Sequence, residues 1–363
     1  MRELVVNARF LSQPITGVQR FAIEVSRELL KSEIPVRFLC PKNSIHHEIA
    51  EEFKAEKCGT LSGTAWEQID LPRMLKKQKK PLLLNLANTG PLAYRNQALV
   101  LHDLAFLVHP EWFSKKFVFW YRFLIPNLLQ KAKIIFTVSE FSKNEITRFW
   151  PGIEGRVFVA GNGLPGLNTG DEAATNLPEN PYILCVSGNN RRKNGESVME
   201  AMNLLNEPGL RLLMLGRRNE NFRTPSRIGN APSMSPKIEF LEDVSDTQLA
   251  SLYQHAEALV YPSSYEGFGL PPLEALSYNC PSILTDIPVF KEIYEGAALF
   301  IPDAKPEHIA KGIEQIRHES GLKETIISRG KDVVERHSFK KVCERMIQRL
   351  FPKEQGKKNP AEK

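Results

Sequence analysis

Short apolar segments alternate with longer helical stretches along nearly the whole chain, which strongly limits the folds it can adopt. In the first half the predicted strands are Leu4–Val6, Val36–Cys40, Leu82–Leu86, Ala98–Leu101 and Ile134–Val138. Helical stretches between them are predicted at 17–31, Glu67–Lys77, Lys115–Gln130 and Ser142–Phe149. Strands separated by helices of this length are typical of a parallel, doubly wound sheet.

The same alternation restarts in the second half. Its predicted strands are Tyr182–Val186, Arg211–Leu215, Lys237–Phe240, Ala258–Tyr261, Ser282–Leu284 and Ala298–Phe300. Predicted helices lie near Glu196–Leu205, at Asp246–His255, at Pro272–Tyr278 and from Pro306 into the 320s. Residues 164–181, rich in Pro, Gly, Asn and acidic side chains, have the composition of a linker, and the polar stretch after Gly216 that of a loop.

The chain is therefore predicted to be an α/β protein of two domains, 1–168 and 176–338. A C-terminal helix within 339–351 could pack back toward the first domain, and the polar residues 352–363 are expected to form a mobile tail. Open parallel sheets bind ligands at the carboxyl ends of their strands. Two such halves facing each other predict an inter-domain cleft.

Composition excludes several other classes of protein. The 363 residues are 42% hydrophobic and 25% charged, and no apolar stretch approaches the ~18–20 residues that span a bilayer. Arg2, Glu3, Asn7 and Arg9 interrupt any signal-peptide core, and the five cysteines are scattered without metal or disulfide spacing. We expect a cytoplasmic, reducing location. The net charge of +6 allows nucleic acid, an anionic membrane or a phosphorylated substrate as partner.

The segment YPSSYEGFGLPPLEALS (261–277) is the most informative motif. Gly267 and Gly269 give a loop whose amides can approach a ligand, and the prolines that follow suit a helix start, which predicts a diphosphate site. Glu274 is expected in the first turn of that helix. Glu266 and Glu274 could contact two sets of sugar hydroxyls on one ligand. Alternatively, Glu274 only complements the helix dipole and Glu266 is a solvated loop residue.

Three other features carry a candidate function beside a structural alternative. The basic residues of SGNNRRKN (187–194) follow a strand and fit phosphate binding, or a solvated turn. His102 interrupts an apolar strand at its carboxyl end, where it is either functional or a structural partner of Asp103. Ser114–Lys133 mixes five basic residues with aromatics, which suits an anionic membrane, a lipid-linked acceptor, or an ordinary helix with a buried aromatic face.

EGFGLPPLEA, with Glu266 and Glu274, resembles the signature of glycosyltransferase family 4, the retaining enzymes that use nucleotide sugars. The flanking EDVSDTQLASLYQHAEALVYPSS and CPSILTDIPVFKEIYEGAALFIP are similar too. In the first half GVQR (17–20), LHDLAFLVHPEWF (101–113) and IIFTVSEFSKNEI (134–146) resemble landmarks of the acceptor domain. The resemblance extends to about Leu350. It implies the GT-B fold, in which two Rossmann-like domains face each other.

The resemblance also implies a role for individual residues. Glu266 would contact the donor sugar and Glu274 the ribose, with the amides of Gly267, Phe268, Gly269 and Leu270 near the sugar and phosphates. Lys193 would bind phosphate, Val244 would lie near the base, Gly17 near the diphosphate, and His102 beside the reacting sugar. The arginine common in the family is absent, since Gly188 stands in its place. Arg192 or Arg191 would substitute for it.

The implied reaction is transfer of a sugar from a nucleoside diphosphate to an acceptor hydroxyl with retention, needing neither a metal nor a cofactor. GDP-mannose is the first candidate donor, and the acceptor would be a saccharide or lipid-linked saccharide of bacterial surface polysaccharide assembly. Peripheral contact with the inner face of the cytoplasmic membrane would fit the basic first half, whereas nucleic acid is not expected. A glycoside hydrolase, a sugar-nucleotide epimerase and a non-catalytic binding module are the alternatives.

Overall fold

The computed structural model describes residues 3–164, 180–187, 190–205, 207, 209–216 and 237–352. The chain divides into two units, which are described separately. The N-terminal unit contains residues 1–163 and 338–363, and the C-terminal unit contains residues 164–337. Most of the predicted linker (164–181), the predicted loop after Gly216 and the tail from residue 353 onward lie outside the described residues.

A parallel sheet with the strand order β3-β2-β1-β4-β5-β6-β7 forms the centre of the N-terminal unit. The strands are β1 (Leu4–Asn7), β2 (Val36–Cys40), β3 (Glu56–Lys57), β4 (Leu82–Asn85), β5 (Gln97–Val100), β6 (Ile134–Thr137) and β7 (Val157–Val159). β1 lies between β2 and β4, so the direction of winding reverses at the β1–β4 pair. Reversal points of this kind are where doubly wound sheets bind ligands.

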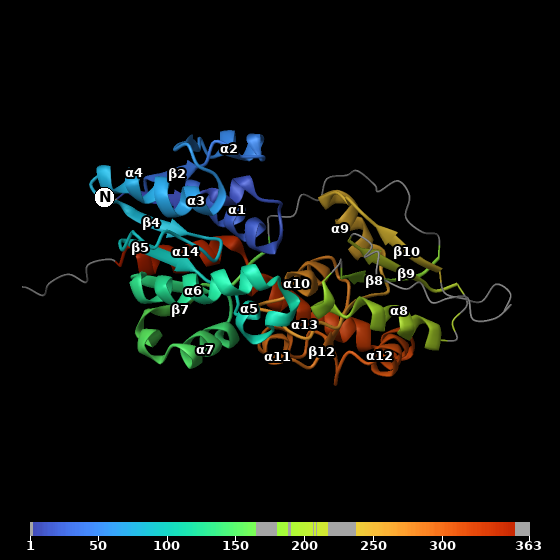
Figure 1. Ribbon diagram of the computed structural model, residues 1–363. Helices are drawn as coiled ribbons and strands as arrows, with labels where there is room; N and C mark the ends of the chain where they lie inside the picture. Colours follow the sequence, from blue (N-terminus) through green and yellow to red (C-terminus); the bar gives the residue numbers. More distant parts are fainter. Residues whose placement is uncertain are drawn as a thin grey trace, which may run out of the picture. The chain divides into compact units, whose positions relative to one another are not determined.

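Helices surround this sheet (Figure 1). They are α1 (Gly17–Leu30), α2 (His47–Glu52), α3 (Gly63–Ala65), α4 (Leu71–Lys77), α5 (Ala105–Val108), α6 (Lys115–Lys131) and α7 (Glu140–Phe149), with the shorter turns η1 (Arg9–Ser12), η3 (Pro110–Trp112) and η4 (Pro151–Arg156). The predicted helix at Glu67–Lys77 is in fact a π-helical turn, η2 (Trp66–Asp70), followed by α4. The turn places the buried carboxylate of Glu67 beside Asn7, whose amide donates to it over 2.8 Å.

The last helix of the chain completes the N-terminal unit. α14 (Phe339–Leu350, red in Figure 1) packs on α1, and the rings of Phe339 and Phe21 meet edge to face with centroids 5.9 Å apart. The side chain of Arg345 donates a hydrogen bond to the carbonyl of Ala160. One face of α14 is buried and the other is charged, which is the pattern of a helix lying on a core.

The C-terminal unit has a second parallel sheet with the order β10-β9-β8-β11-β12-β13. Its described strands are β8 (Tyr182–Val186), β9 (Arg211–Leu215), β10 (Lys237–Leu241), β11 (Ala258–Tyr261), β12 (Ser282–Thr285) and β13 (Leu299–Ile301). Its described helices are α8 (Gly195–Leu204), α9 (Asp246–His255), α10 (Leu270–Ser277), α11 (Pro288–Tyr294), α12 (Pro306–His318) and α13 (Leu322–Arg336), with the turn η5 (Arg191–Lys193). Both units are therefore Rossmann-like, and the predicted fold class is confirmed.

Other predictions also differ from the structure, which has two strands, β3 and β7, that were not expected. α11 and α13 were not expected, and the region from Pro306 contains two helices, since α12 ends at His318 and Gly321, with a φ of 79°, is the N-cap of α13. Glu274 is not in the first turn of its helix. α10 begins at Leu270, so that the carboxylate lies in the second turn, where it cannot complement the first-turn amides as predicted.

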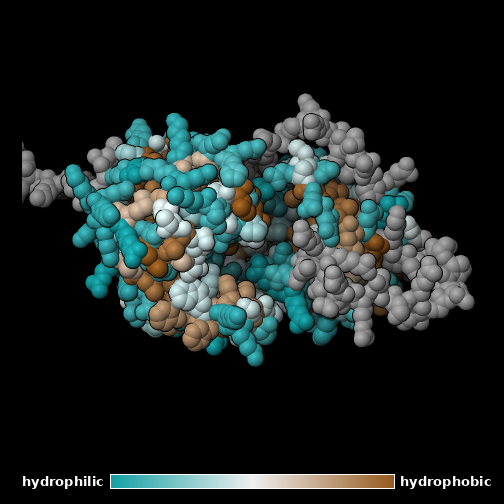
Figure 2. Space-filling view, turned by 45° about the horizontal axis from the view of Figure 1, so that its top comes forward, coloured by the Kyte–Doolittle hydropathy of each residue, from teal (hydrophilic) through white to brown (hydrophobic). Residues whose placement is uncertain are grey.

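Surface and interior follow the expected division. Hydrophilic side chains cover most of the visible surface of both units, with smaller hydrophobic patches among them (Figure 2). All five cysteines are buried as free thiols. Within the ranges given above, no helix has both the length and the apolarity required to cross a membrane.

Gly269 begins α10 with a φ of 88°, in the left-handed region. A Cβ there would lie 2.5 Å from Cε1 of Phe290, a ring that is fully buried and packed against Tyr261 and Tyr294. Both the backbone conformation and the space require glycine.

We expect Gly269→Ala to destabilise the C-terminal unit by roughly 2–5 kcal/mol, combining left-handed strain with overpacking. Gly209→Ala is the matched control, because Gly209 has a φ of 89° and no described atom within 4 Å of the position that a Cβ would take. Strain alone should cost that variant about 1–2 kcal/mol. Calorimetric unfolding of the full chain measures both, and equal losses would show that the Phe290 contact is unimportant.

Candidate functional site

The pairing of β8 with β11 brings together two loops that are distant in sequence. These strands are parallel neighbours, with Val260 beside Cys185 and Leu259 beside Leu184. The chain leaves β8 toward η5 and leaves β11 toward the EGFG loop. Because the carboxyl ends of parallel strands lie at one edge of a sheet, both loops emerge at the same place.

Asn194 fixes these two loops to each other. Its side-chain amide donates to the carbonyl of Pro262 over 2.7 Å and contacts Oγ of Ser264 at 2.8 Å. The backbone N–H of Ser264 donates to the carbonyl of Arg192 over 2.8 Å. Asn194 has a φ of 51°, a conformation that asparagine tolerates better than most residues. The basic turn is therefore held against the EGFG loop, with Arg192 and Lys193 half-buried.

Glu266 lies at the centre of this arrangement with only 6% of its surface exposed. Its Oε1 accepts hydrogen bonds from the hydroxyls of Tyr261 (2.7 Å) and Ser263 (3.0 Å). Its Oε2 lies 3.3 Å from a guanidinium nitrogen of Arg192. A buried carboxylate needs this compensation by hydrogen bonds and a cation. The alternative in which Glu266 is a solvated loop residue is therefore wrong.

Lys193 faces the same group of side chains. Its Nζ lies 5.3 Å from the centre of the Tyr261 ring. Desolvation lowers the pKa of the Lys193 ammonium, and the Glu266 carboxylate opposes that change. Burial and the same carboxylate raise the pKa of the Tyr261 phenol well above its ordinary value. The hydroxyl therefore stays protonated and donates a hydrogen bond to Glu266.

Glu274 lies in α10 and accepts a hydrogen bond from the hydroxyl of Tyr253 over 3.2 Å. Both Glu274 and Glu266 contribute to the electrostatic field at Lys193. The carboxylates of Glu266 and Glu274 thus lie close enough to the Lys193 ammonium to interact with it electrostatically. Val244, which the resemblance assigns to the base, is half-buried in the connection between β10 and α9.

The start of α10 offers few backbone donors. With Gly269 as N-cap, the first three helical residues are Leu270, Pro271 and Pro272, and the two prolines have no N–H. Anion binding at this end would therefore depend on the amides of the loop from Gly267 to Leu270. The carbonyl of Gly269 accepts a hydrogen bond from Tyr294, which helps to fix the loop.

His102 lies in the N-terminal unit, just beyond β5, and is 6% exposed. Its Nε2 donates to the carbonyl of Leu86 over 3.1 Å, and its ring meets that of Phe21 edge to face at 4.7 Å. Its backbone carbonyl accepts from the hydroxyl of Ser142 over 3.1 Å. Burial lowers the pKa of His102, which favours the neutral ring near pH 7.

Gly17 is the first residue of α1 and is exposed. Thr16 and Gln19, on either side of it, form a capping box, in which the Gln19 side chain accepts from the backbone N–H of Thr16 over 3.2 Å. A capped helix start keeps the loop before Gly17 in a defined conformation.

The structure adds residues that sequence reasoning did not single out. Tyr261 and Ser263 hold Glu266, Asn194 joins the two loops, and Tyr253 contacts Glu274. Tyr261 and Ser263 lie inside the motif, but nothing in the sequence distinguishes them from ordinary strand-end residues. The contact with Glu266 also distinguishes the two candidates for the arginine that the family pattern lacks here. Arg192 pairs with the Glu266 carboxylate, whereas Arg191 is exposed and no such pair is found for it among the described residues.

Within the described residues, no cluster of three or more His, Cys, Asp or Glu side chains could hold a metal ion.

Comparison with known proteins agrees with this architecture. The chain is 28% identical over 355 residues to the O-antigen chain mannosyltransferase RfbU of Salmonella typhimurium, covering 93% of this chain and 96% of the relative. It is 27% identical over 356 residues to the serotype-specific mannosyltransferase WbdA of Escherichia coli. That match covers 86% of this chain but only 41% of WbdA, a longer protein.

Solved structures show the fold. The sucrose-phosphate synthase of Thermosynechococcus elongatus superposes with a TM-score of 0.72 at 18% identity, covering 96% of this chain and 98% of that one. HepE of Anabaena, in complex with UDP and glucose, gives a TM-score of 0.74 at 14% identity, covering 96% and 99%. Residues 169–333 match the family described as glycosyl transferases group 1. The C-terminal unit is therefore similar to the group 1 glycosyltransferases, and the chain has the GT-B fold.

Proposed function

We propose that the protein is a retaining mannosyltransferase that uses GDP-mannose and a saccharide or lipid-linked saccharide acceptor in bacterial surface polysaccharide assembly. The observation that carries the proposal is the group formed by Arg192, Lys193 and Glu266 in a unit similar to the group 1 glycosyltransferases. The names of RfbU and WbdA support mannose as the sugar.

The cations of the β8 loop suit a leaving diphosphate. A departing nucleoside diphosphate gains negative charge as the glycosidic bond breaks, and fixed positive charge stabilises that change. Lys193 and Arg192 would supply it, together with amides of the loop from Gly267 to Leu270. Because the leaving group is already an anion of low basicity, no metal and no protein acid are needed in this proposal.

Glu266 would position the donor sugar. Tyr261 and Ser263 occupy Oε1 and Arg192 approaches Oε2, while a carboxylate has about four acceptor positions. The remaining capacity suits a sugar hydroxyl. Glu274 would accept from the ribose hydroxyls, and the carbonyl or ring of His102 would lie beside the reacting sugar. The acceptor hydroxyl would then attack on the face from which the diphosphate leaves and give its proton to that phosphate.

Nucleotide preference gives a direct test. A product nucleotide that binds the folded state at a hundred times its Kd stabilises it by about 2.7 kcal/mol. We expect GDP to raise the Tm of the full chain more than UDP, dTDP or ADP do. Glu274→Gln should reduce this shift, whereas Glu314→Gln, an exposed carboxylate on α12, should preserve it. A larger shift with UDP would refute GDP-mannose as the donor.

The two arginines provide a matched pair of variants for the cation proposal. We expect Lys193→Ala and Arg192→Ala to lower kcat for nucleotide release in the presence of saccharide acceptors by about 10²–10³-fold. Arg191→Ala, its exposed neighbour, should stay within about twofold of the unmodified protein. Circular dichroism checks that each variant is folded. Full activity in folded Lys193→Ala would exclude this group as the diphosphate site.

The lowered pKa of Lys193 predicts how donor affinity depends on pH. A bound diphosphate favours the charged ammonium and so raises the pKa, and binding then requires proton uptake once the pH exceeds the depressed value of the free protein. We expect GDP affinity to fall as the pH rises from about 7 to 10, starting below the ordinary lysine pKa.

Lys193→Arg is the control for this effect, because its side chain stays charged throughout that range. Calorimetric titration in buffers of different ionisation enthalpy measures both affinity and proton uptake. A flat profile for the unmodified protein would show that the ammonium does not face the phosphates.

A further inference from the structure

Helix α6 exposes two aromatic side chains that the core does not use. Phe119 is 78% exposed and Phe123 is 52% exposed, and their spacing of four residues puts them on one face of the helix. Phe117 and Tyr121 behave differently, because their rings stack at 4.0 Å and lie against the core. The buried aromatic face expected for an ordinary helix is therefore present, and the opposite face of the same helix carries the exposed Phe119 and Phe123.

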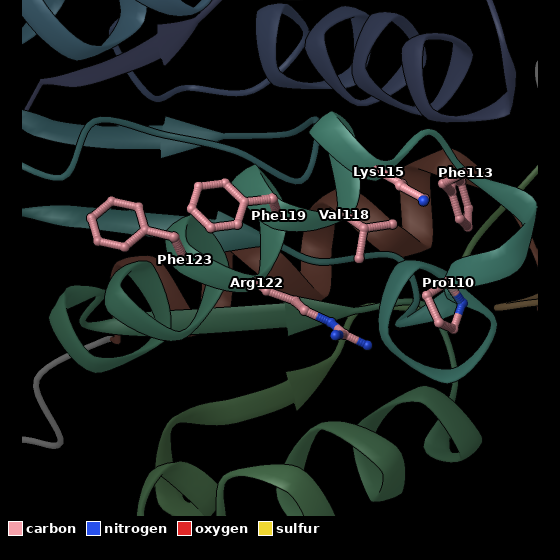
Figure 3. A pocket seen from close by; sticks show the side chains of 7 residues that line it. All are labelled: Pro110, Phe113, Lys115, Val118, Phe119, Arg122 and Phe123. Atoms are coloured by element: carbon pink, nitrogen blue, oxygen red, sulfur yellow. The ribbon is translucent and has the colours of Figure 1, made fainter.

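A pocket of about 510 Å³ adjoins the exposed pair (Figure 3). Its apolar lining includes Phe113, Val118, Phe119 and Phe123, and two cations, Lys115 and Arg122, complete it. Figure 3 shows the rings of Phe119 and Phe123 leaving successive turns of α6, with the guanidinium of Arg122 extending toward the segment of Pro110. The volume and lining suit part of a hydrocarbon chain beside an anionic group.

Both charged side chains that line this pocket, Lys115 and Arg122, are cations. Lys115, Lys116 and Arg122 are exposed, and none of the three forms an ion pair with a carboxylate in the described ranges. Glu111 is the only acidic residue between positions 104 and 133, and its carboxylate lies 3.1 Å from Nδ1 of His109. Exposed apolar side chains flanked by unneutralised cations form the pattern of an interfacial membrane helix.

We propose that the α6 face, defined as Phe113, Lys115, Phe119, Arg122 and Phe123, docks on an anionic phospholipid bilayer. Phe119 and Phe123 enter the boundary between headgroups and acyl chains, and Lys115 and Arg122 contact lipid phosphates. A protein partner with a matching apolar surface would not require two cations without a carboxylate among the residues of this face, so charge complementarity favours the lipid surface. The binding leaves α6 parallel to the membrane plane and involves no spanning segment.

Sedimentation of the full-chain protein with vesicles tests this surface without any donor or acceptor, so its outcome is independent of the proposed activity. We expect binding to vesicles made of equal parts of phosphatidylcholine and phosphatidylglycerol, and at least tenfold weaker binding to phosphatidylcholine alone. Because the attraction is partly electrostatic, 1 M salt, where the Debye length is about 3 Å, should release most of the protein.

Two pairs of substitutions separate the apolar and charged contributions. Phe119→Ser with Phe123→Ser, and Lys115→Gln with Arg122→Gln, should each weaken binding to the mixed vesicles by at least tenfold, since each cation near the surface contributes about fivefold. Leu204→Ser with Ile45→Ser is the matched apolar control, because these side chains are 55% and 54% exposed. Lys311→Gln with Lys331→Gln, two exposed lysines of the C-terminal unit, is the charge control.

Three outcomes would overturn the proposal. Equal binding to neutral and mixed vesicles would remove the role of charge. Unchanged binding of both α6 pairs would move the contact elsewhere. A dimer that forms through Phe119 and Phe123 in sedimentation equilibrium, without vesicle binding, would identify a second copy of the chain as the occupant. Unchanged circular dichroism in the charge pair keeps the result interpretable even if the phenylalanine pair folds poorly.

Discussion

The pairing of β8 with β11 is the constraint on which the candidate site depends. Residues 190–194 and 262–266 are distant in sequence, and they meet because two parallel strands end at the same edge of the sheet. The hydrogen bonds of Asn194 and Ser264 then hold the loops at a fixed separation. Cations on one loop and a carboxylate on the other are thus placed by backbone geometry, which is more rigid than any side-chain contact. Gly269 and Phe290 fix the far end of the same loop in a similar way.

A buried ion pair usually costs as much in desolvation as it gains in attraction. Here the cost is offset in stages, since Tyr261 and Ser263 satisfy one oxygen of Glu266 and Arg192 approaches the other. Lys193 lies beside this pair, and desolvation lowers the pKa of its ammonium more than the Glu266 carboxylate raises it. The C-terminal unit therefore holds a cation that an added anion would stabilise. In such a preorganised site the positive charge is already in position before a ligand arrives, so that binding requires no reorganisation of these side chains.

Much of this arrangement follows from the sequence and some of it does not. The alternation of apolar and helical segments predicted the two parallel sheets except for the short edge strands β3 and β7, and the string EGFGLPPLEA marked the loop where the site lies. α13 was missed because its buried positions are few, and α11 because it is short and begins at a proline. The prediction that Glu274 lies in the first helical turn was wrong because it depended on where α10 starts, and two consecutive prolines leave that start ambiguous in the sequence. Side-chain partners such as Tyr253 could not be predicted, since the pattern of a strand or helix does not show which hydroxyl donates to which carboxylate.

The return of α14 to the first unit makes that unit discontinuous in the chain. α1 and α14 pack together, yet about 300 residues separate them in sequence, and the whole C-terminal unit is synthesised in between. At about 5–20 residues per second, the ribosome takes roughly ten to forty seconds to pass from residue 163 to residue 350. During that time the face of α1 that packs against α14, which includes Phe21, has no α14 to cover it on the nascent chain. The order of synthesis thus makes the second unit the first that can fold to completion.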